Sequence, residues 1–430
     1  MGFSRDERKP LVSHSSPSRQ EIKAVTILAL GFGLVGVDRY LISTMYPLIA
    51  KDLHLGLGDI GTITGSLAIA WSISALFMGN LSDRIGRRRI LVAALLVFAL
   101  LIGASGLATS LMGLVAVRLV MGLADGGFTP ASISATIEAS ALKRRGRNIG
   151  FQQMTLTLFG LGFCPLAVAG LLHFVNWRWI FLVFSIPGFL IAWFTWRIIP
   201  GKETVANEEK RSSLDDWKAV LSYHNIPLLA LGQLCWLVCL VCTSAFIPNF
   251  VTDHLHLGFN TMGIIMSAIG IGSGVGTVIL PWFSDKIGRK PVMLISSLGA
   301  CFMLILFNCA GANPYLLFAT MFMVHFFNNS LITLTVGPLC AETVPPVLMA
   351  TASGVVIAVG ELFGGGLGTV IAGQAAEHFK DLIGIGRVLY LPVIALAAGF
   401  LICTQLHETL PKLAKSRAEI ASDPCEELSE

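Results

Sequence analysis

Long apolar stretches recur along nearly the whole chain, and only short polar connections interrupt them. A helix of roughly 20 apolar residues crosses a hydrocarbon core about 30 Å thick. Only helices and closed barrels satisfy their backbone polar groups in lipid, and the alternating strands of membrane barrels are absent here. The pattern therefore predicts an all-α membrane protein. The twelve predicted transmembrane helices lie near residues 23–50, 59–82, 90–110, 112–141, 147–173, 178–199, 227–252, 259–283, 291–312, 314–341, 347–378 and 386–409.

The longest polar interruption between these helices divides the chain into two parts of about equal size. It predicts two pseudo-symmetric six-helix bundles joined by a cytoplasmic linker, with a polar tail at each end. The expected domains are residues 1–22 (N-terminal tail), 23–200 (first bundle), 201–226 (linker), 227–410 (second bundle) and 411–430 (C-terminal tail).

Composition supports a lipid-exposed surface. The chain is 54% hydrophobic and 13% charged, whereas soluble domains carry about 25% charged residues. The lipid bilayer is therefore an expected partner, and nucleic acid is not. We find no legible catalytic set and no phosphate-binding loop. The sequence therefore predicts neither an enzyme nor an ATP-driven pump, and we expect a gradient to drive the protein.

The distribution of basic residues predicts the orientation. With the N-terminus in the cytoplasm, cytoplasmic segments hold 24 of the 30 Lys and Arg residues. Basic residues concentrate in cytoplasmic loops. We therefore expect both termini in the cytoplasm, in a multi-pass protein of the cell (inner or plasma) membrane.

Two loops share the pattern S-D-(R/K)-I-G-R-(R/K), and their aspartates, Asp83 and Asp285, are 202 residues apart. Each loop follows the second helix of its half. The glycine permits a tight turn, the aspartate can pair with a basic group or cap a helix, and the basic cluster anchors the loop. Repeats of this kind place a substrate path between the halves.

At these residues the chain resembles the major facilitator superfamily, whose hallmark loop reads G-x-L-(A/S)-D-R-x-G-R-(K/R). The resemblance covers essentially the whole chain. It implies two six-helix bundles that rock against each other, so that the site between them opens alternately to the two sides of the membrane. Arg118, Gly122, Asp125 and Pro130 fit a further pattern of that family. Residues 348–350 depart from it, because no arginine follows there. The residues to which the resemblance assigns conformational gating are Gly79, Asp83, Arg84, Gly86, Arg87, Arg88, Glu138, Arg145, Asp285, Gly288, Arg289 and Glu342.

Charges within the predicted helices mark candidate sites, because each costs at least roughly 2.5–3.5 kcal/mol near the bilayer centre. Asp38 and Arg39 are adjacent on the first helix and point about 100° apart, so each should meet another helix or the cavity. Arg39 is the first choice for a substrate carboxylate, because a guanidinium grips one bidentately. A structural clamp is the alternative for both residues.

Asp125 follows Arg118 by seven residues, so both lie on one face of the fourth helix. We predict a proton site at Asp125, whereas a structural role and a ligand role stay equally open for Arg118. Glu361 lies among glycines that allow close helix approach. It is a candidate for proton or substrate coupling, and a protonated acid bonded to a neighbour is the alternative. The predicted proton-coupling set is Asp38, Asp125 and Glu361.

Neutral polar and aromatic residues complete the candidate solute site. Asn328 and Asn329 can orient a polar solute, Gln152 and Gln153 are similar, and His325 is interpreted as a packing residue. Tyr46, Trp71 and Trp236 can wall a cavity, although most aromatic residues of such a chain face lipid. The predicted substrate-binding set is Arg39, Tyr46, Trp71, Arg118, Gln152, Gln153, Trp236, Asn328 and Asn329.

Within the superfamily, Val37-Asp38-Arg39-Tyr40 with Arg118 and Asp125 resembles the anion:cation symporters, which import sugar acids and other carboxylates with protons. That branch usually has glutamate where Asp125 stands. The resemblance implies symport of a small organic anion, with a proton as coupling ion and no other cofactor. Spinster-like lipid or lysolipid transport is the alternative, followed by proton-coupled drug antiport. We expect a monomer that binds the anion and the proton mostly in its first half and recognises the shape of the solute mostly in its second half.

Overall fold

The computed structural model describes residues 18–141, 144–201, 214–345, 348–378 and 389–410. Within these ranges the side chains of residues 76–85, 214–216 and 350 are not described. The described residues form helices and no strand. Residues 1–17 of the predicted N-terminal tail, the C-terminal tail and much of the linker thus lie outside the described residues, as do the side-chain positions of the predicted gating residues Gly79, Asp83 and Arg84.

The described residues of the first half form six helical rods, one of which changes helix type along its length. Polar side chains cap several helices: Ser18 Oγ, for example, accepts from Glu21 N at 3.0 Å at the start of the first helix. The rods are α1 (Arg19–Leu53), α2 (Leu57–Ile85), α3 (Arg87–Ser105), α4 (Leu111–Ala139), the continuous α5 (Arg145–Thr157), η2 (Leu158–Phe163) and α6 (Cys164–Leu171), and α7 (Trp177–Ile198).

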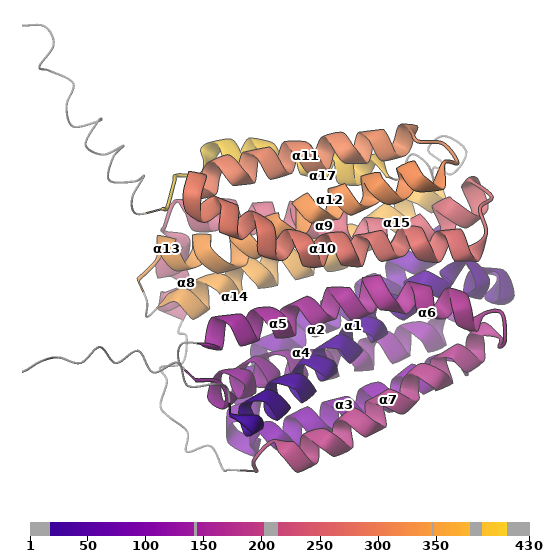
Figure 1. Cartoon of the computed structure of the whole chain (residues 1–430), viewed down its shortest axis with the longest axis horizontal. Coiled ribbons are helices and arrows are strands. Elements are labelled where there is room, and N and C mark those ends of the chain that lie inside the picture. The colour runs from indigo at the N-terminus through magenta and orange to yellow at the C-terminus, as the bar shows by residue number, and fades with distance from the viewer. Residues whose placement is uncertain (1–17, 142–143, 202–213, 346–347, 379–388, 411–430) are drawn as a thin grey trace, which may run out of the picture.

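The second half repeats this order after a short helix, α8 (Leu214–Leu221). Its rods are α9 (Asn225–Asn249) with η3 (Phe250–His254), α10 (Phe259–Ile287), α11 (Arg289–Cys309), α12 (Pro314–Leu334) with η4 (Thr335–Leu339) and α13 (Cys340–Thr343), α14 (Met349–Val359) with η6 (Gly360–Leu367) and α15 (Gly368–His378), and α17 (Tyr390–Gln405). Figure 1 shows the two halves side by side.

Ten rods of the described chain are long and apolar enough to cross a membrane. The two other predicted spans coincide with α2, which has 29 residues, and with α17, which has 16. The all-α prediction is confirmed, and the predicted bounds agree with the helices to within a few residues.

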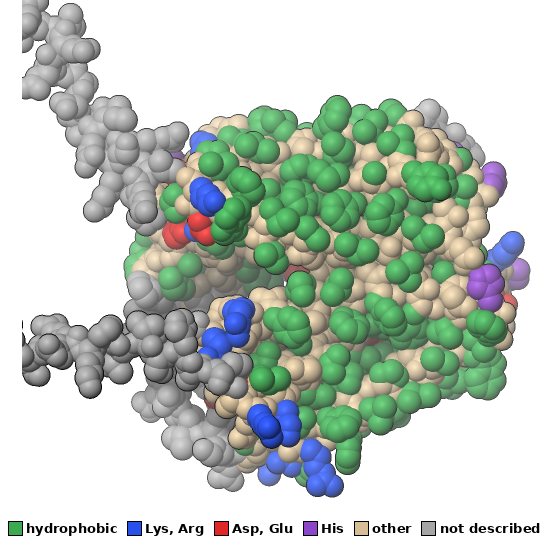
Figure 2. Space-filling model, viewed as in Figure 1, with side chains coloured by type: hydrophobic (Ala, Val, Ile, Leu, Met, Phe, Trp, Pro, Cys, Tyr) green, Lys and Arg blue, Asp and Glu red, His purple; other side chains and the backbone are tan. Residues whose placement is uncertain are grey.

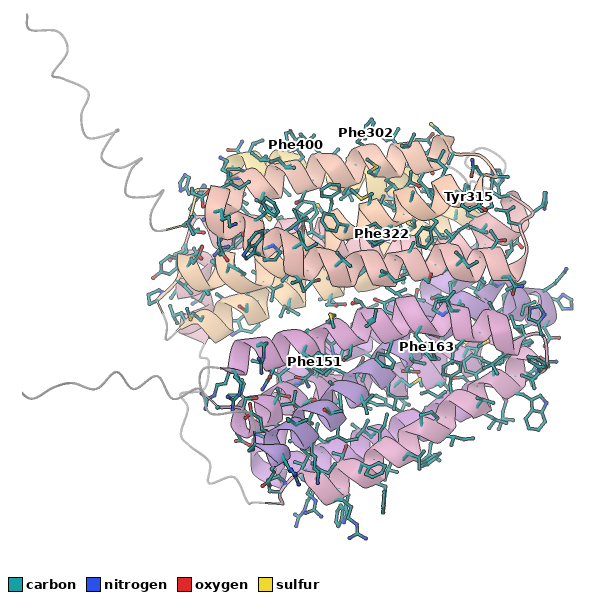
Figure 3. All side chains as sticks on the ribbon, in the orientation of Figure 1. Phe151, Phe163, Phe302, Tyr315, Phe322 and Phe400 are labelled. Carbon is teal, nitrogen blue, oxygen red and sulfur yellow. The ribbon has the colours of Figure 1, made fainter. Side chains whose placement is uncertain are left out.

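The outer surface is apolar around the sides of both halves. Phe151, Phe163 and Phe302 are 45%, 56% and 62% exposed, and their side chains project outward (Figure 3). Figure 2 shows hydrophobic side chains covering this face, whereas the charged groups gather at the two ends. Such a surface is suited to contact with lipid tails, because soluble proteins rarely expose large apolar patches to water. The fold is that of a multi-pass membrane protein.

The halves meet at one end of the molecule, which we call the closed end; it contains the α1–α2 connection around Gly56. There α2 packs on α15 and η6, and α10 packs on η2 and α6. Leu57 N donates to Glu377 Oε2 at 2.7 Å across the boundary. A Cβ on Gly61 would lie 2.5 Å from Thr369 O, so a bare backbone is required for this approach.

The opposite end carries the two repeated loops, at Gly86 and Gly288, and we call it the loop-motif end. Figure 2 shows the surface recessed between the halves at this end. The space between the halves therefore opens toward the repeated loops and is shut at the closed end.

Two π-helical segments occupy matched places in the halves. η2 begins at Leu158 and η6 begins at Gly360, the same 202-residue offset as between the repeated loops. Such segments hold an extra residue per turn and occur frequently at functional sites. Both pack against the other half: η2 contacts α10, and η6 contacts α2.

Gly270→Ala should open the closed end. A Cβ on Gly270 would overlap Gly162 N of the other half, where neither backbone can yield, whereas a Cβ on Gly274 would meet only Met154 Cγ at 3.7 Å. Spin labels at Lys51 and Asp253, in a background with the native cysteines replaced, should report longer distances for Gly270→Ala. The matched Gly274→Ala variant should keep the original distances. Equal distance distributions in the two variants would contradict the proposed role of Gly270.

Candidate functional site

Helix α1 directs two adjacent charges to different helices. Asp38 Oδ1 lies 3.2 Å from Arg118 Nη1 of α4, and the same Nη1 donates to Asp38 O at 2.9 Å. Arg118 Nη2 also donates to Ser105 Oγ at 3.3 Å. The Arg118 and Asp38 side chains are 1% and 5% exposed. Asp38 and Arg118 therefore form a fully buried clamp inside the first half.

Arg39 reaches the other half of the protein. Its Nη2 donates to Glu361 Oε2 in η6 at 2.6 Å, and the two side chains are 13% and 10% exposed. The guanidinium carbon also lies 5.5 Å from the centre of the Trp71 ring, within range of a cation–π interaction. Arg39 is thus held between an acid of the second half and an aromatic ring of α2.

Asp125 is the third acid of this centre. It is 4% exposed, and within the described residues its Oδ1 has no hydrogen-bond partner. It lies within electrostatic range of Arg39, Asp38 and Glu361. A buried carboxylate oxygen without a hydrogen-bond partner is costly, and a bound proton lowers that cost. Asp125 is therefore equipped to accept a proton.

A small cavity adjoins both arginines. Its lining combines guanidinium groups with hydroxyl groups from helices of both halves, and it has room for about one water molecule. The polar residues lining it are Arg39, Tyr40, Ser43, Thr64, Arg118 and Ser244.

The structure adds the second half to the charged centre through Glu361, which was already a candidate for coupling. The expectation that the first half binds most of the anion and the proton stays a prediction. The expectation that Asp38 and Arg39 each meet another helix is confirmed. Arg118 contacts Asp38, so the shared face of α4 does not pair Arg118 with Asp125.

The second-half candidates bond to neighbouring helices. Asn328 Nδ2 donates to Trp236 O at 3.1 Å, and Asn329 Nδ2 donates to Thr277 Oγ1 at 2.6 Å. His325 Nε2 lies 3.1 Å from Thr243 Oγ1 and is fully buried, as expected of a packing residue. The Trp236 ring packs against the backbone of α17. The structure does not bring Trp236 to the Arg39 centre.

Three first-half candidates also lie apart from Arg39. Tyr46 is buried, and its hydroxyl donates to the Gly56 carbonyl at the closed end. Gln152 is buried and donates to Ser132 Oγ at 2.6 Å. Gln153 is exposed on α5. The structure thus brings together Arg39, Trp71, Asp125 and Glu361, with the Asp38–Arg118 clamp beside them.

At the first repeated loop, Gly86 has φ of +99° at the start of α3, a conformation that favours glycine. Arg87 pairs with Glu138 at the end of α4. The Arg88 guanidinium stacks 3.9 Å from the centre of the Trp196 ring. The basic cluster therefore ties the turn to α4 and α7 of its own half.

The second repeated loop makes the matching contacts. Gly288 has φ of +108°. Arg289 Nη1 lies 2.6 Å from Asp285 Oδ1, and its Nη2 lies 2.8 Å from Glu342 Oε1. The lack of a basic residue at 348–350 does not prevent this network, because Arg289 itself supplies the cation.

At the α4–α5 connection the structure pairs Arg144 with an acid, and the gating role of Arg145 stays a prediction. Arg145 is exposed, whereas Arg144 Nε and Nη2 donate to Glu21 at 3.0 and 2.6 Å. The hydrogen bond to Glu21 raises the pKa of Arg144 above its usual value. Asn148 also donates to Glu21, so the start of α1 is bound to the start of α5.

Sequence reasoning also missed Glu377, which binds the backbone of α2 across the closed end. Its only signal was its position as an acid at the end of a predicted helix. The Glu21–Arg144 pair gave no signal, because its members are 123 residues apart.

The described chain has two six-helix halves with a polar centre between them, and this centre is approached from one end. These are features of a transporter. The sequence matches the profile of the Major Facilitator Superfamily over residues 28–369 and 241–422. The chain belongs to this superfamily, and it is a transport protein rather than an enzyme.

Similar proteins agree with this assignment. A putative metabolite transport protein of Haemophilus influenzae is 27% identical over 398 residues, covering 88% of this chain and 95% of that protein. The sialic acid transporter NanX of Escherichia coli is 25% identical, covering 87% and 91%. A bacterial homologue of the human lysosomal transporter Spinster, solved inward-facing and unoccupied, superposes with a TM-score of 0.76 at 16% identity, covering 91% and 98%. This last likeness concerns the fold alone.

Proposed function

We propose that this protein is a proton-driven symporter of a small organic anion with a carboxylate group. The observation that supports this proposal most strongly is the position of Arg39, whose mostly buried guanidinium lies at the boundary between the halves. A guanidinium offers paired N–H donors that fit a carboxylate. The similarity to NanX supports this choice, since sialic acid is a sugar acid.

The proton is assigned to Asp125. Its buried and unpartnered oxygen lies in the electrostatic range of Arg39, so the charge of an arriving anion and the protonation of the acid are linked. The coupling ion is then the proton, with no other cofactor. Alternating access exposes this centre first at one end and then at the other.

The orientation in the membrane is part of the same proposal. The many basic residues near the repeated loops support a cytoplasmic position for the loop-motif end. The proposal takes the protein to be a monomer in the cell membrane. The closed end then faces outward, and the anion would leave through the recess between the halves.

Uptake into proteoliposomes tests the function. An inward proton gradient should drive accumulation of an acid from a panel containing N-acetylneuraminate, galactonate, aromatic acids and dicarboxylates. A lysolipid in the same panel tests the spinster-like alternative. If an acid is taken up but the proton gradient does not stimulate its uptake, transport is not coupled to protons. If only lysolipid is taken up, the solute is not an organic anion.

Arg39→Lys should weaken binding of the transported acid about tenfold or more, which corresponds to about 1.4 kcal/mol. Lysine keeps the positive charge but lacks the planar fork. Isothermal titration of the purified protein measures this change. Arg197→Lys, a change on the outer surface of α7, serves as the control. Unchanged affinity in Arg39→Lys would remove Arg39 from the solute site.

A further inference from the structure

The contact between Arg39 and Glu361 joins two residues 322 positions apart in the chain. It is a charge-assisted hydrogen bond of 2.6 Å between largely buried side chains. It is made across the boundary between the halves, in the same centre as Asp125. A carboxylate of the protein therefore already occupies the guanidinium that the proposed function assigns to the solute.

The backbone around Glu361 is adapted to this contact. Glu361 lies in the π-helical η6, and Gly364, Gly365 and Gly366 follow it. A Cβ on Gly365 would lie 2.9 Å from Glu361 Oε2 and 3.8 Å from Arg39 Nη2. A side chain at this position would crowd the carboxylate, so the glycine leaves the ion pair open on that side.

We propose that Glu361 is an internal substitute for the solute: it holds Arg39 in the empty protein and is exchanged for the solute carboxylate during loading. This inference rests on the proposed function. The chemistry of the exchange is one carboxylate for another at the same guanidinium, so the favoured solute presents a single carboxylate to Arg39.

Charge balance extends the argument to the proton. In the empty centre Arg39 and Glu361 neutralise each other. When a solute carboxylate binds Arg39, the displaced Glu361 becomes an extra negative charge in a site that also contains Asp125. A buried charge without a partner is strongly unfavourable. Binding of the proton at Asp125, the acid to which the proposed function assigns it, restores the original net charge of the centre, so anion and proton enter together.

Chemical rescue tests the exchange without knowledge of the natural solute. Glu361→Ala removes the internal carboxylate and leaves space beside Arg39. Acetate should then raise the thermal stability of this purified full-length variant in a saturable way. Wild-type protein should respond little, because Glu361 fills the position. Acetamide, which has the same shape without the charge, should have no effect on either.

The double variant Arg39→Ala/Glu361→Ala is the matched control, and acetate should not stabilise it. An equal acetate response in the wild type and in Glu361→Ala would overturn the proposal, as would the absence of any response in Glu361→Ala. A response that persists in the double variant would also overturn it, since acetate would then bind elsewhere.

Glu361→Gln gives a second measurement that does not depend on folding of the alanine variant. If Glu361 competes with the solute for Arg39, galactonate or N-acetylneuraminate should bind this variant about tenfold more tightly than the wild type. A purely structural tie between the halves predicts weaker binding. Glu361→Asp, which keeps the carboxylate, should return toward wild-type affinity. Equal or weaker binding by Glu361→Gln would count against the exchange.

The two proposals fail in different ways. If acetate stabilises Glu361→Ala but no acid shows proton-driven uptake, the carboxylate exchange is supported and the proton symport is rejected. Proton-driven uptake of an acid, with no rescue and no gain of affinity in Glu361→Gln, would retain the symport and reject the exchange.

Discussion

Asp125→Asn should abolish accumulation of the transported acid against its gradient, while exchange of labelled for unlabelled acid across the membrane continues. Asparagine keeps the shape of aspartate but binds no proton at neutral pH, so anion movement loses its link to the proton gradient. Asp125 is suited to this role because it is 4% exposed and has an oxygen without a hydrogen-bond partner in the described chain.

Proteoliposomes with an imposed proton gradient measure accumulation, and proteoliposomes preloaded with acid measure exchange. Asp52→Asn is the control: this aspartate is 49% exposed and pairs with Arg178 at the closed end. It should accumulate acid like the wild type. Gradient-driven accumulation at the wild-type level in Asp125→Asn would exclude this acid as the proton site.

Asp38→Asn should lower the free energy of unfolding by about 3–5 kcal/mol, because breaking a buried ion pair leaves an unbalanced charge in the interior. The partner left behind is Arg118, whose side chain is 1% exposed. Denaturant unfolding in detergent measures the change. Asp52→Asn breaks an exposed pair with the same kinds of side chain, and it should cost about 0–1 kcal/mol.

This second result also decides between the roles foreseen for Asp38. A large loss of stability with proton coupling retained in the surviving protein would identify a clamp. Little loss of stability together with lost coupling would instead place Asp38 in the proton path, as the sequence alone predicted.

The helices could be predicted because their signal is local. Apolar runs, the turn glycines Gly86 and Gly288, and the repeated loop each depend on neighbouring residues. The partners of the buried charges could not be predicted in this way. Neither the adjacency of Asp38 and Arg39 nor the spacing of Arg118 and Asp125 says which helices pack together. The packing sends Asp38 to α4 and Arg39 to the second half.

The same limit applies to the arginines at the α4–α5 connection. A motif names a cluster of arginines, but the rotation of α5 at its first residue decides which of them faces Glu21. Arg144 precedes the helix and reaches Glu21, whereas Arg145 points to the exposed side. Glu361 was found by its burial in an apolar, glycine-rich run, although its partner was not.

The π-helical geometry of η6 gives the Arg39–Glu361 contact a mechanical property. A π segment contains one residue more than a regular turn can hold, and residues of an α-helix are about 100° apart around the axis. If η6 relaxed to a regular helix by a shift of one residue, the Glu361 carboxylate would rotate away from Arg39 while the helix axis stayed in place. A twist of one short segment, rather than the swing of a whole bundle, would then be enough to disengage the acid.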